Sequence, residues 1–206
     1  MQTLTLKIDG KFEPEDFIDI LEGIESLYYK ATDHRRRFYL PELYYFDRLA
    51  PGQSYTERLN SANQWLLKEA RMTTHGENRL FVSRIIYASP GGMDFTGIGK
   101  ALEAIERIIG RLIAFFTERH KRRETDKQAS LDTQIKEIEV EKERETLRAI
   151  QIENAREILA LRRDFPDELQ EVLLPLAVQD QERLSNQIAE GHLLSLIHIS
   201  EPTRPY

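Results

Sequence analysis

The stretch Ser89-Pro-Gly-Gly-Met-Asp-Phe-Thr-Gly-Ile-Gly-Lys100 divides the chain into two parts with different sequence patterns. Before it, short alternating runs and amphipathic segments predict strands and helices. After it, Gly110 is the only glycine before Pro166, which favours long helical structure. We therefore expect an α+β fold, with a small sheet and packed helices followed by a long, charged, coiled-coil-like helix and a C-terminal helical segment.

The first 97 residues, termed the head, carry the strand patterns. Leu4, Leu6 and Ile8 alternate with polar residues, which predicts a half-buried strand. The spacing i, i+3, i+4 predicts two amphipathic helices, and a later run with apolar residues on both of its faces predicts an inner strand. The predicted elements are a strand at 4–8, helices at 14–28 and 54–72, a strand at 80–87 and a short hairpin partner at 93–96.

The glycines of the dividing stretch are the candidate binding residues. A glycine loop between a strand and a helix can hold phosphate, because backbone amides and the helix dipole point at the anion. The spacing matches neither the phosphate-loop pattern nor the dinucleotide pattern, so a structural role as a tight turn and a close helix approach is favoured. The candidate phosphate ligands are Gly91, Gly92, Gly97, Gly99 and the counter-charge Lys100.

A resemblance supports the fold expectation. The segment Arg84-Ile-Ile-Tyr-Ala-Ser-Pro-Gly-Gly92, followed by Asp94-x-x-Gly-Ile-Gly-Lys100, resembles a loose group of bacterial proteins that have no assigned activity. That group shares an N-terminal Leu-x-Leu-x-Ile-x-Gly strand, a helix, a Ser-Pro-Gly segment and a helical extension. The resemblance covers roughly residues 1–120. It implies a fold type and carries over no catalytic residues.

Residues 98–164 form the predicted long helix. Its first part, 102–123, has a broad apolar face that ends in basic residues; a core position is favoured over docking on a membrane surface. Its second part has a weak heptad stripe with Asn154 at a core position, which predicts a partner helix, either in another protein or in a second copy of the chain. A solitary exposed helix is the alternative.

The C-terminal part has two segments. Residues 165–193 predict a helix that either folds back on the long helix or begins a further domain. Residues Leu194-Ser-Leu-Ile-His-Ile-Ser-Glu-Pro-Thr-Arg204 resemble the translation of a transposase sequencing adapter. We therefore expect residues 194–206 to be an artefactual tail and the natural reading frame to be cut near Leu193.

The composition excludes several classes of function. The net charge of −6 gives no basic field for nucleic acid, although basic residues and aromatics adjoin at 34–46, where core packing is favoured over binding. Without cysteine there is no thiol chemistry, and the other residues suggest no catalytic, metal or cofactor site. A cytoplasmic location is expected, because no signal peptide or membrane-spanning run is evident.

These observations favour a non-enzymatic interaction or oligomerisation module. The first alternative is a phosphate-binding or nucleotide-binding domain that uses residues 89–100. The second alternative is docking on a membrane surface through residues 102–123. The expected partner is a protein or a second copy bound through the long helix, and nucleic acid is not expected.

Overall fold

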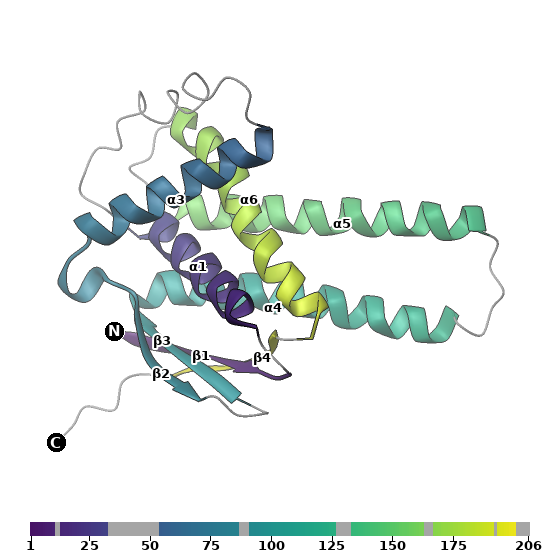
Figure 1. The fold of residues 1–206 in the computed structure, drawn as a ribbon, viewed down its shortest axis with the longest axis horizontal. Helices are drawn as coiled ribbons and strands as arrows, with labels where there is room; N and C mark the ends of the chain where they lie inside the picture. The colour runs from purple at the N-terminus through teal and green to yellow at the C-terminus, as the bar shows by residue number, and fades with distance from the viewer. Residues whose placement is uncertain are drawn as a thin grey trace.

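The computed structural model describes residues 1–10, 13–32, 54–86, 91–126, 133–162, 167–191 and 193–200. The fold is α+β, with the helices packed together on one side of an antiparallel sheet (Figure 1). The elements are β1 (Gln2–Ile8), α1 (Pro14–Ala31), α3 (Tyr55–Thr73), the 3-10 helix η1 (Gly76–Asn78), β2 (Phe81–Ile86), β3 (Gly91–Gly97), α4 (Gly99–Asp126), α5 (Thr133–Ala160), α6 (Asp167–Ala189) and β4 (Leu193–Ser200).

The sheet has the strand order β2-β3-β1-β4, and all neighbouring strands are antiparallel. β1 and β3 pair along their full length without a register shift. Leu4, Leu6 and Ile8 are buried, as a period of two residues requires when one face of a sheet meets the core. The predicted strand at 4–8 is therefore confirmed, and it lies inside the sheet.

Both predicted helices of the head are confirmed, and each begins with a capping arrangement. At α1, the Asp16 carboxylate accepts a hydrogen bond from the Glu13 amide at 2.8 Å. At α3, the Ser54 hydroxyl accepts from the Glu57 amide, and the Glu57 carboxylate accepts from the Ser54 amide at 2.7 Å. These contacts satisfy N–H groups that no carbonyl within the helix can reach.

The hairpin of β2 and β3 confirms the short strand predicted at 93–96. The prediction that β2 is an inner strand is wrong, because β2 forms an edge of the sheet and all six of its residues are exposed. The position of the covering helix explains the difference. α4 packs against β1 and β4, on the other half of the sheet, so it leaves β2 to solvent.

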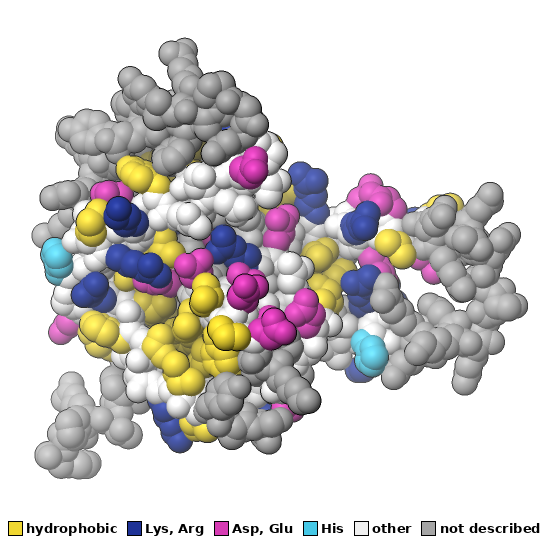
Figure 2. Space-filling model, in the orientation of Figure 1, with side chains coloured by type: hydrophobic (Ala, Val, Ile, Leu, Met, Phe, Trp, Pro, Cys, Tyr) yellow, Lys and Arg dark blue, Asp and Glu magenta, His cyan; other side chains and the backbone are white. Residues whose placement is uncertain are grey.

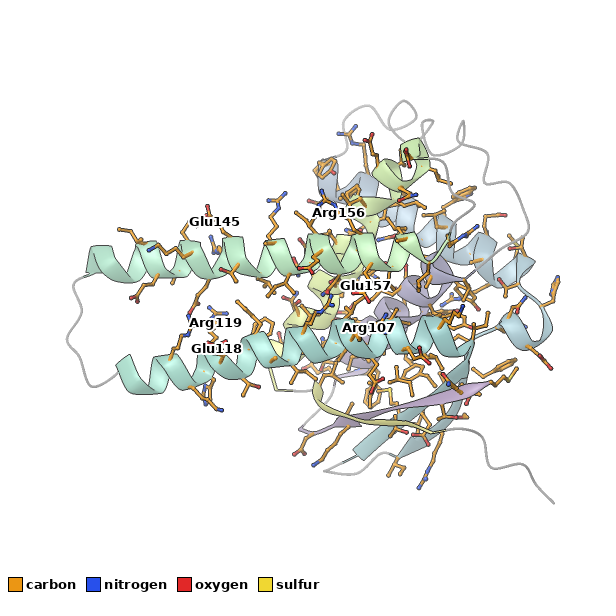
Figure 3. All side chains as sticks on the ribbon, turned by 180° about the vertical axis from the view of Figure 1, so that it is seen from behind. Arg107, Glu118, Arg119, Glu145, Arg156 and Glu157 are labelled. Atoms are coloured by element: carbon orange, nitrogen blue, oxygen red, sulfur yellow. The ribbon has the colours of Figure 1, made fainter. Side chains whose placement is uncertain are left out.

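The helical stretch predicted at 98–164 is divided into two helices. α4 and α5 run antiparallel and side by side, and their far ends project from the body of the protein (Figures 1 and 3). We term the projecting part, residues 115–126 and 133–147, the arm. Within the same chain, α5 packs against both α4 and α6, while Ile138 and Val140 near its start stay exposed.

α6 folds back over the head, which is one of the two arrangements expected for the C-terminal helix. It packs on α1 and α5 and continues as helix through Pro175 (Figure 1). Gly23 of α1 permits the close approach, because a methyl group there would lie 3.1 Å from the Leu184 side chain. One core cluster accordingly takes residues from the sheet and from all the helices α1 to α6 that the structure describes.

Residues 193–200 form β4, which pairs with β1 at the edge of the sheet opposite β2. This strand includes the beginning of the tail at 194–206. Its pairing with β1 has two register irregularities, whereas the pairing of β1 with β3 has none. The adapter origin of the tail stays a prediction. If a chain ending at residue 192 keeps the near-UV circular dichroism of the full chain, the fold does not depend on β4.

Candidate functional site

The five candidate residues of the glycine stretch do not come together. Gly91 and Gly92 open β3 and Gly97 closes it, so about 20 Å of extended strand separates them. Gly99 and Lys100 begin α4, and Ile98 is the single residue between the strand and the helix. A phosphate loop needs successive amides curved around one anion. Within residues 91–100, the part of this stretch that the structure describes, no such loop is present.

Close packing accounts for Gly97. A methyl group at this position would come within 2.7 Å of the phenol ring of Tyr28 in α1. The Tyr28 hydroxyl accepts a hydrogen bond from the Ile98 amide at 2.9 Å and donates one to the Asn78 carbonyl at 3.1 Å. Burial raises the pKa of Tyr28 to about 12, because the phenolate would lose hydration, and the hydrogen bond from Ile98 only partly opposes this shift. The structural role favoured for Gly97 is thus supported.

A connected polar cluster lies in the interior between α1, α3 and α6. Lys30 is buried, and its ammonium donates to the Asp180 carboxylate at 2.6 Å. It also donates to the Ser26 hydroxyl at 2.7 Å and to the Asn63 side-chain oxygen at 2.8 Å. Asn63 in turn donates to the second carboxylate oxygen of Asp180 at 3.2 Å. All three N–H groups of the ammonium therefore have acceptors.

This cluster holds helices together and is unsuited to general-base catalysis. A lysine base needs a free lone pair, whereas the Lys30 ammonium donates through all three of its N–H groups. Burial lowers the pKa of Lys30 and raises the pKa of Asp180, because both charges lose hydration, and their mutual attraction opposes both shifts. Asp180 is fully buried. We interpret the Lys30–Asp180 pair, together with Asn63, as a polar contact that holds α1, α6 and α3 together.

Lys30 and Asp180 belong to no sequence motif, although the sequence holds a signal for their pairing. Lys30 lies three residues after Leu27 on the buried face of α1, and Asp180 lies between buried leucines of α6. Opposite charges on two apolar helix faces predict a pair, because an unpaired buried charge is strongly destabilising. The partners are 150 residues apart, so sequence spacing cannot match them.

A second polar cluster joins α5 to α4 and α6. The Asn154 side chain accepts a hydrogen bond from Arg111 at 2.7 Å and donates one to Gln181 at 3.0 Å. Glu157 pairs with Arg111 at 2.8 Å and with Arg107 at 2.6 Å (Figure 3). Asn154 is therefore satisfied inside one chain. Homo-oligomerisation through the long helix stays a prediction, but Asn154 gives it no support.

The apolar face of α4 is covered by the rest of the protein from Leu102 to Leu112 and is partly exposed at Ile113 and Phe116. Membrane docking through residues 102–123 would need that face at the surface. The core position favoured by the sequence is confirmed for five residues that are fully buried: Leu102, Ile105, Ile108, Ile109 and Leu112. Among the helices that the structure describes, none combines the length and the apolar character needed to cross a membrane.

The basic and aromatic cluster at 34–46 lies outside the described residues. Within the described ranges, no group of three His, Asp or Glu side chains is arranged to hold a metal ion.

The exposed apolar surface of β2 is the feature that sequence reasoning placed wrongly. Val82 lies opposite Phe95 and Ile85 lies opposite Met93 in the ladder, and both β3 residues are fully buried. Figure 2 shows hydrophobic side chains gathered on this side of the molecule, where the sheet and the start of α1 lie. The exposed fractions on β2 are 43% for Phe81, 43% for Val82, 52% for Ile85 and 39% for Ile86.

Comparison with protein-family models, with curated proteins and with solved structures finds no match to this chain.

Proposed function

We propose that this protein is a non-enzymatic interaction module that binds a protein strand along β2. We use the term β2 edge for the six residues Phe81–Ile86 together with the hydrogen-bonding side of the strand that faces away from β3. The observation that carries the proposal is the exposure of four large apolar side chains on a strand that has β3 as its one neighbour among the described residues. An added strand would gain main-chain hydrogen bonds and would bury these side chains.

The polar side chains beside the β2 edge also suit burial by a partner. The Thr96 hydroxyl donates to the Ser83 hydroxyl at 3.1 Å, and the Thr5 hydroxyl donates to the Asp94 carboxylate at 2.7 Å. Covering polar groups is costly when it leaves them without hydrogen bonds. The Ser83 hydroxyl also donates to the Asp94 carbonyl at 3.2 Å, so the hydroxyl on the β2 edge is already hydrogen-bonded and an incoming strand can cover it at small cost.

A library of linear peptides displayed on phage tests the proposal. Selection on the immobilised chain should enrich peptides with alternating apolar residues. These peptides should bind at least tenfold more weakly to Ile85→Lys, because the lysine places a charge in the apolar contact. The matched control is Ile18→Lys on α1, since Ile18 is 51% exposed and Ile85 is 52% exposed.

The control variant should bind the selected peptides as the natural sequence does. Selection that enriches no peptide would overturn the proposal. So would peptides that bind equally well to Ile85→Lys and to the unsubstituted chain, because their site would then lie elsewhere.

A further inference from the structure

The β2 edge has the side-chain pattern of an inner strand but lacks a second neighbour among the described residues. Its core face carries Val82 and Ile85, which continue the buried row of β3. Its outer face carries Phe81 and Ile86, opposite Thr96 and Gly92. Apolar residues on both faces are typical of strands that are covered on both sides. The described helices therefore leave part of the apolar strand surface uncovered.

The pattern of apolar and polar side chains along the β2 edge is the same from either end: two apolar, two polar and two apolar residues. The register shift between Val82 and Arg84 makes Ser83 an extra residue in the ladder. The Ser83 hydroxyl contacts that of Thr96, so Ser83 points to the outer face, as Arg84 does opposite Asp94. The faces from residue 81 to residue 86 are thus outer, core, outer, outer, core and outer.

We infer that the β2 edge pairs with the β2 edge of a second copy of this chain, antiparallel, about a two-fold axis between Ser83 and Arg84. This inference rests on the proposed function and names its partner. The pairing places Phe81 opposite the Ile86 of the second copy and Val82 opposite its Ile85. Every apolar side chain then meets an apolar side chain on the same face, which is the contact that stabilises a sheet.

Charge selects the same register. In the inferred pairing, Arg84 lies opposite Ser83 of the second copy and beside Asp94 of its own β3, which has the opposite charge. Moving the axis by half a residue, onto Arg84, would place two guanidinium groups directly opposite each other, and like charges in that position destabilise a sheet. That register would also place Ser83, which points to the outer face, opposite Ile85 of the second copy, which points to the core face.

The inferred contact is small, and small interfaces are typical of weak, transient association. The resulting sheet is continuous across the axis, with β2, β3, β1 and β4 of each copy in order outward. A pairing through one six-residue strand with four partly exposed apolar side chains would bury less surface than the roughly 800 Å² per partner of a standard stable interface. We therefore expect reversible self-association with a Kd in the micromolar range.

Sedimentation equilibrium of the full chain over a range of concentrations tests the inference. The unsubstituted chain and Ile18→Lys should show the same monomer–dimer equilibrium. Ile85→Lys should raise the dissociation constant at least tenfold. A chain that stays monomeric up to its solubility limit would overturn the inference, and so would a dimer that Ile85→Lys leaves unchanged.

Cysteine cross-linking tests the register, because the chain has no cysteine of its own. Phe81→Cys and Ile86→Cys should form a disulfide-linked dimer when the two variants are mixed and oxidised. Each variant alone should not, since equivalent residues lie about 17 Å apart in the inferred pairing. Cross-linking of Arg84→Cys with itself, without the mixed product, would indicate a different register and overturn the inferred one.

The two proposals can fail separately. If selected peptides bind the β2 edge while the chain stays monomeric, the interaction function stands and the second copy is not its partner. If no peptide is enriched and no dimer forms, both proposals fail.

Discussion

Two ion pairs with the same separation of 2.6 Å have different surroundings in this molecule. The side chains of Lys30 and Asp180 are 5% and 0% exposed in the body, whereas those of Arg119 and Glu143 are 27% and 24% exposed on the arm. Equal distances do not give equal energies, because the buried charges have lost their hydration and the arm pair keeps part of its own. Loss of one partner should therefore matter far more in the body.

The two regions also differ in what surrounds the ion pairs. The cluster around Lys30 lies within an apolar core that several elements share. The arm is held by pairs such as Arg119 with Glu143, while Ile138 and Val140 of α5 stay exposed. Regions with few buried apolar contacts open at lower free energy than the core. We expect amide hydrogens of the arm to exchange before those of α1 and α6.

The largest effect is expected for Asp180→Ala. It should lower the free energy of unfolding by about 3–5 kcal/mol, because it leaves the Lys30 ammonium buried without its counter-charge. Urea unfolding followed by circular dichroism measures the change. The double variant Lys30→Met with Asp180→Leu is the control, and it should recover most of the lost stability since neither charge remains. A loss below about 1 kcal/mol for Asp180→Ala would contradict the buried pair.

Gly97→Ala should destabilise the body by about 1–3 kcal/mol. The added methyl group would lie 2.7 Å from the Tyr28 ring, so the ring must move away from its hydrogen bonds with Ile98 and Asn78. Thermal unfolding together with near-UV circular dichroism checks this result. Adding Tyr28→Leu should make the alanine less costly, and equal costs in both backgrounds would count against the packing explanation.

The ion pairs of Glu157 with Arg107 and Arg111 should show a smaller, pH-dependent effect. Burial alone would raise the pKa of Glu157, but the hydrogen bonds and charges of Arg107 and Arg111 outweigh it and lower the pKa. The stability from this group is present above the unfolded-state pKa of about 4.3 and is lost as the pH falls through the folded-state pKa. Glu157→Gln should therefore lose less stability than the unsubstituted chain between neutral and acidic pH. If the free energy of unfolding changes equally with pH in Glu157→Gln and in the unsubstituted chain, this expectation is wrong.

The smallest effect is expected on the arm. A double-mutant cycle with Arg119→Ala and Glu143→Ala should give a coupling energy of about 0.2–1 kcal/mol, because both side chains keep contact with water. The coupling should fall as salt is added, since exposed charges are screened. A coupling as large as the cost of Asp180→Ala would remove the contrast between the two regions.

Several elements could be predicted from the sequence because their signals are local. The alternation at 4–8 and the helical spacing at 14–28 and 54–72 each correspond to an element of the structure. The tight turn expected at 90–92 is wrong for Gly91 and Gly92, which open β3. The division of residues 98–164 was missed, since every part of that stretch favours helix and the spacing does not say where the chain reverses. Close packing accounts for two of the candidate phosphate ligands, because a methyl group would lie 2.7 Å from Tyr28 at Gly97 and still closer to the Gln2 side chain at Gly99.

The sequence by itself determined the strand at 4–8, the two head helices and the helical character of 98–164 and 165–193, because side-chain periodicity follows backbone geometry. It did not indicate that 193–200 form a strand. The tertiary structure alone decided that β2 lies at an edge, that α5 pairs with α4 and that Lys30 meets Asp180. Those outcomes depend on how separate segments share one core. No local pattern records which apolar face will cover another, or which one will be left exposed.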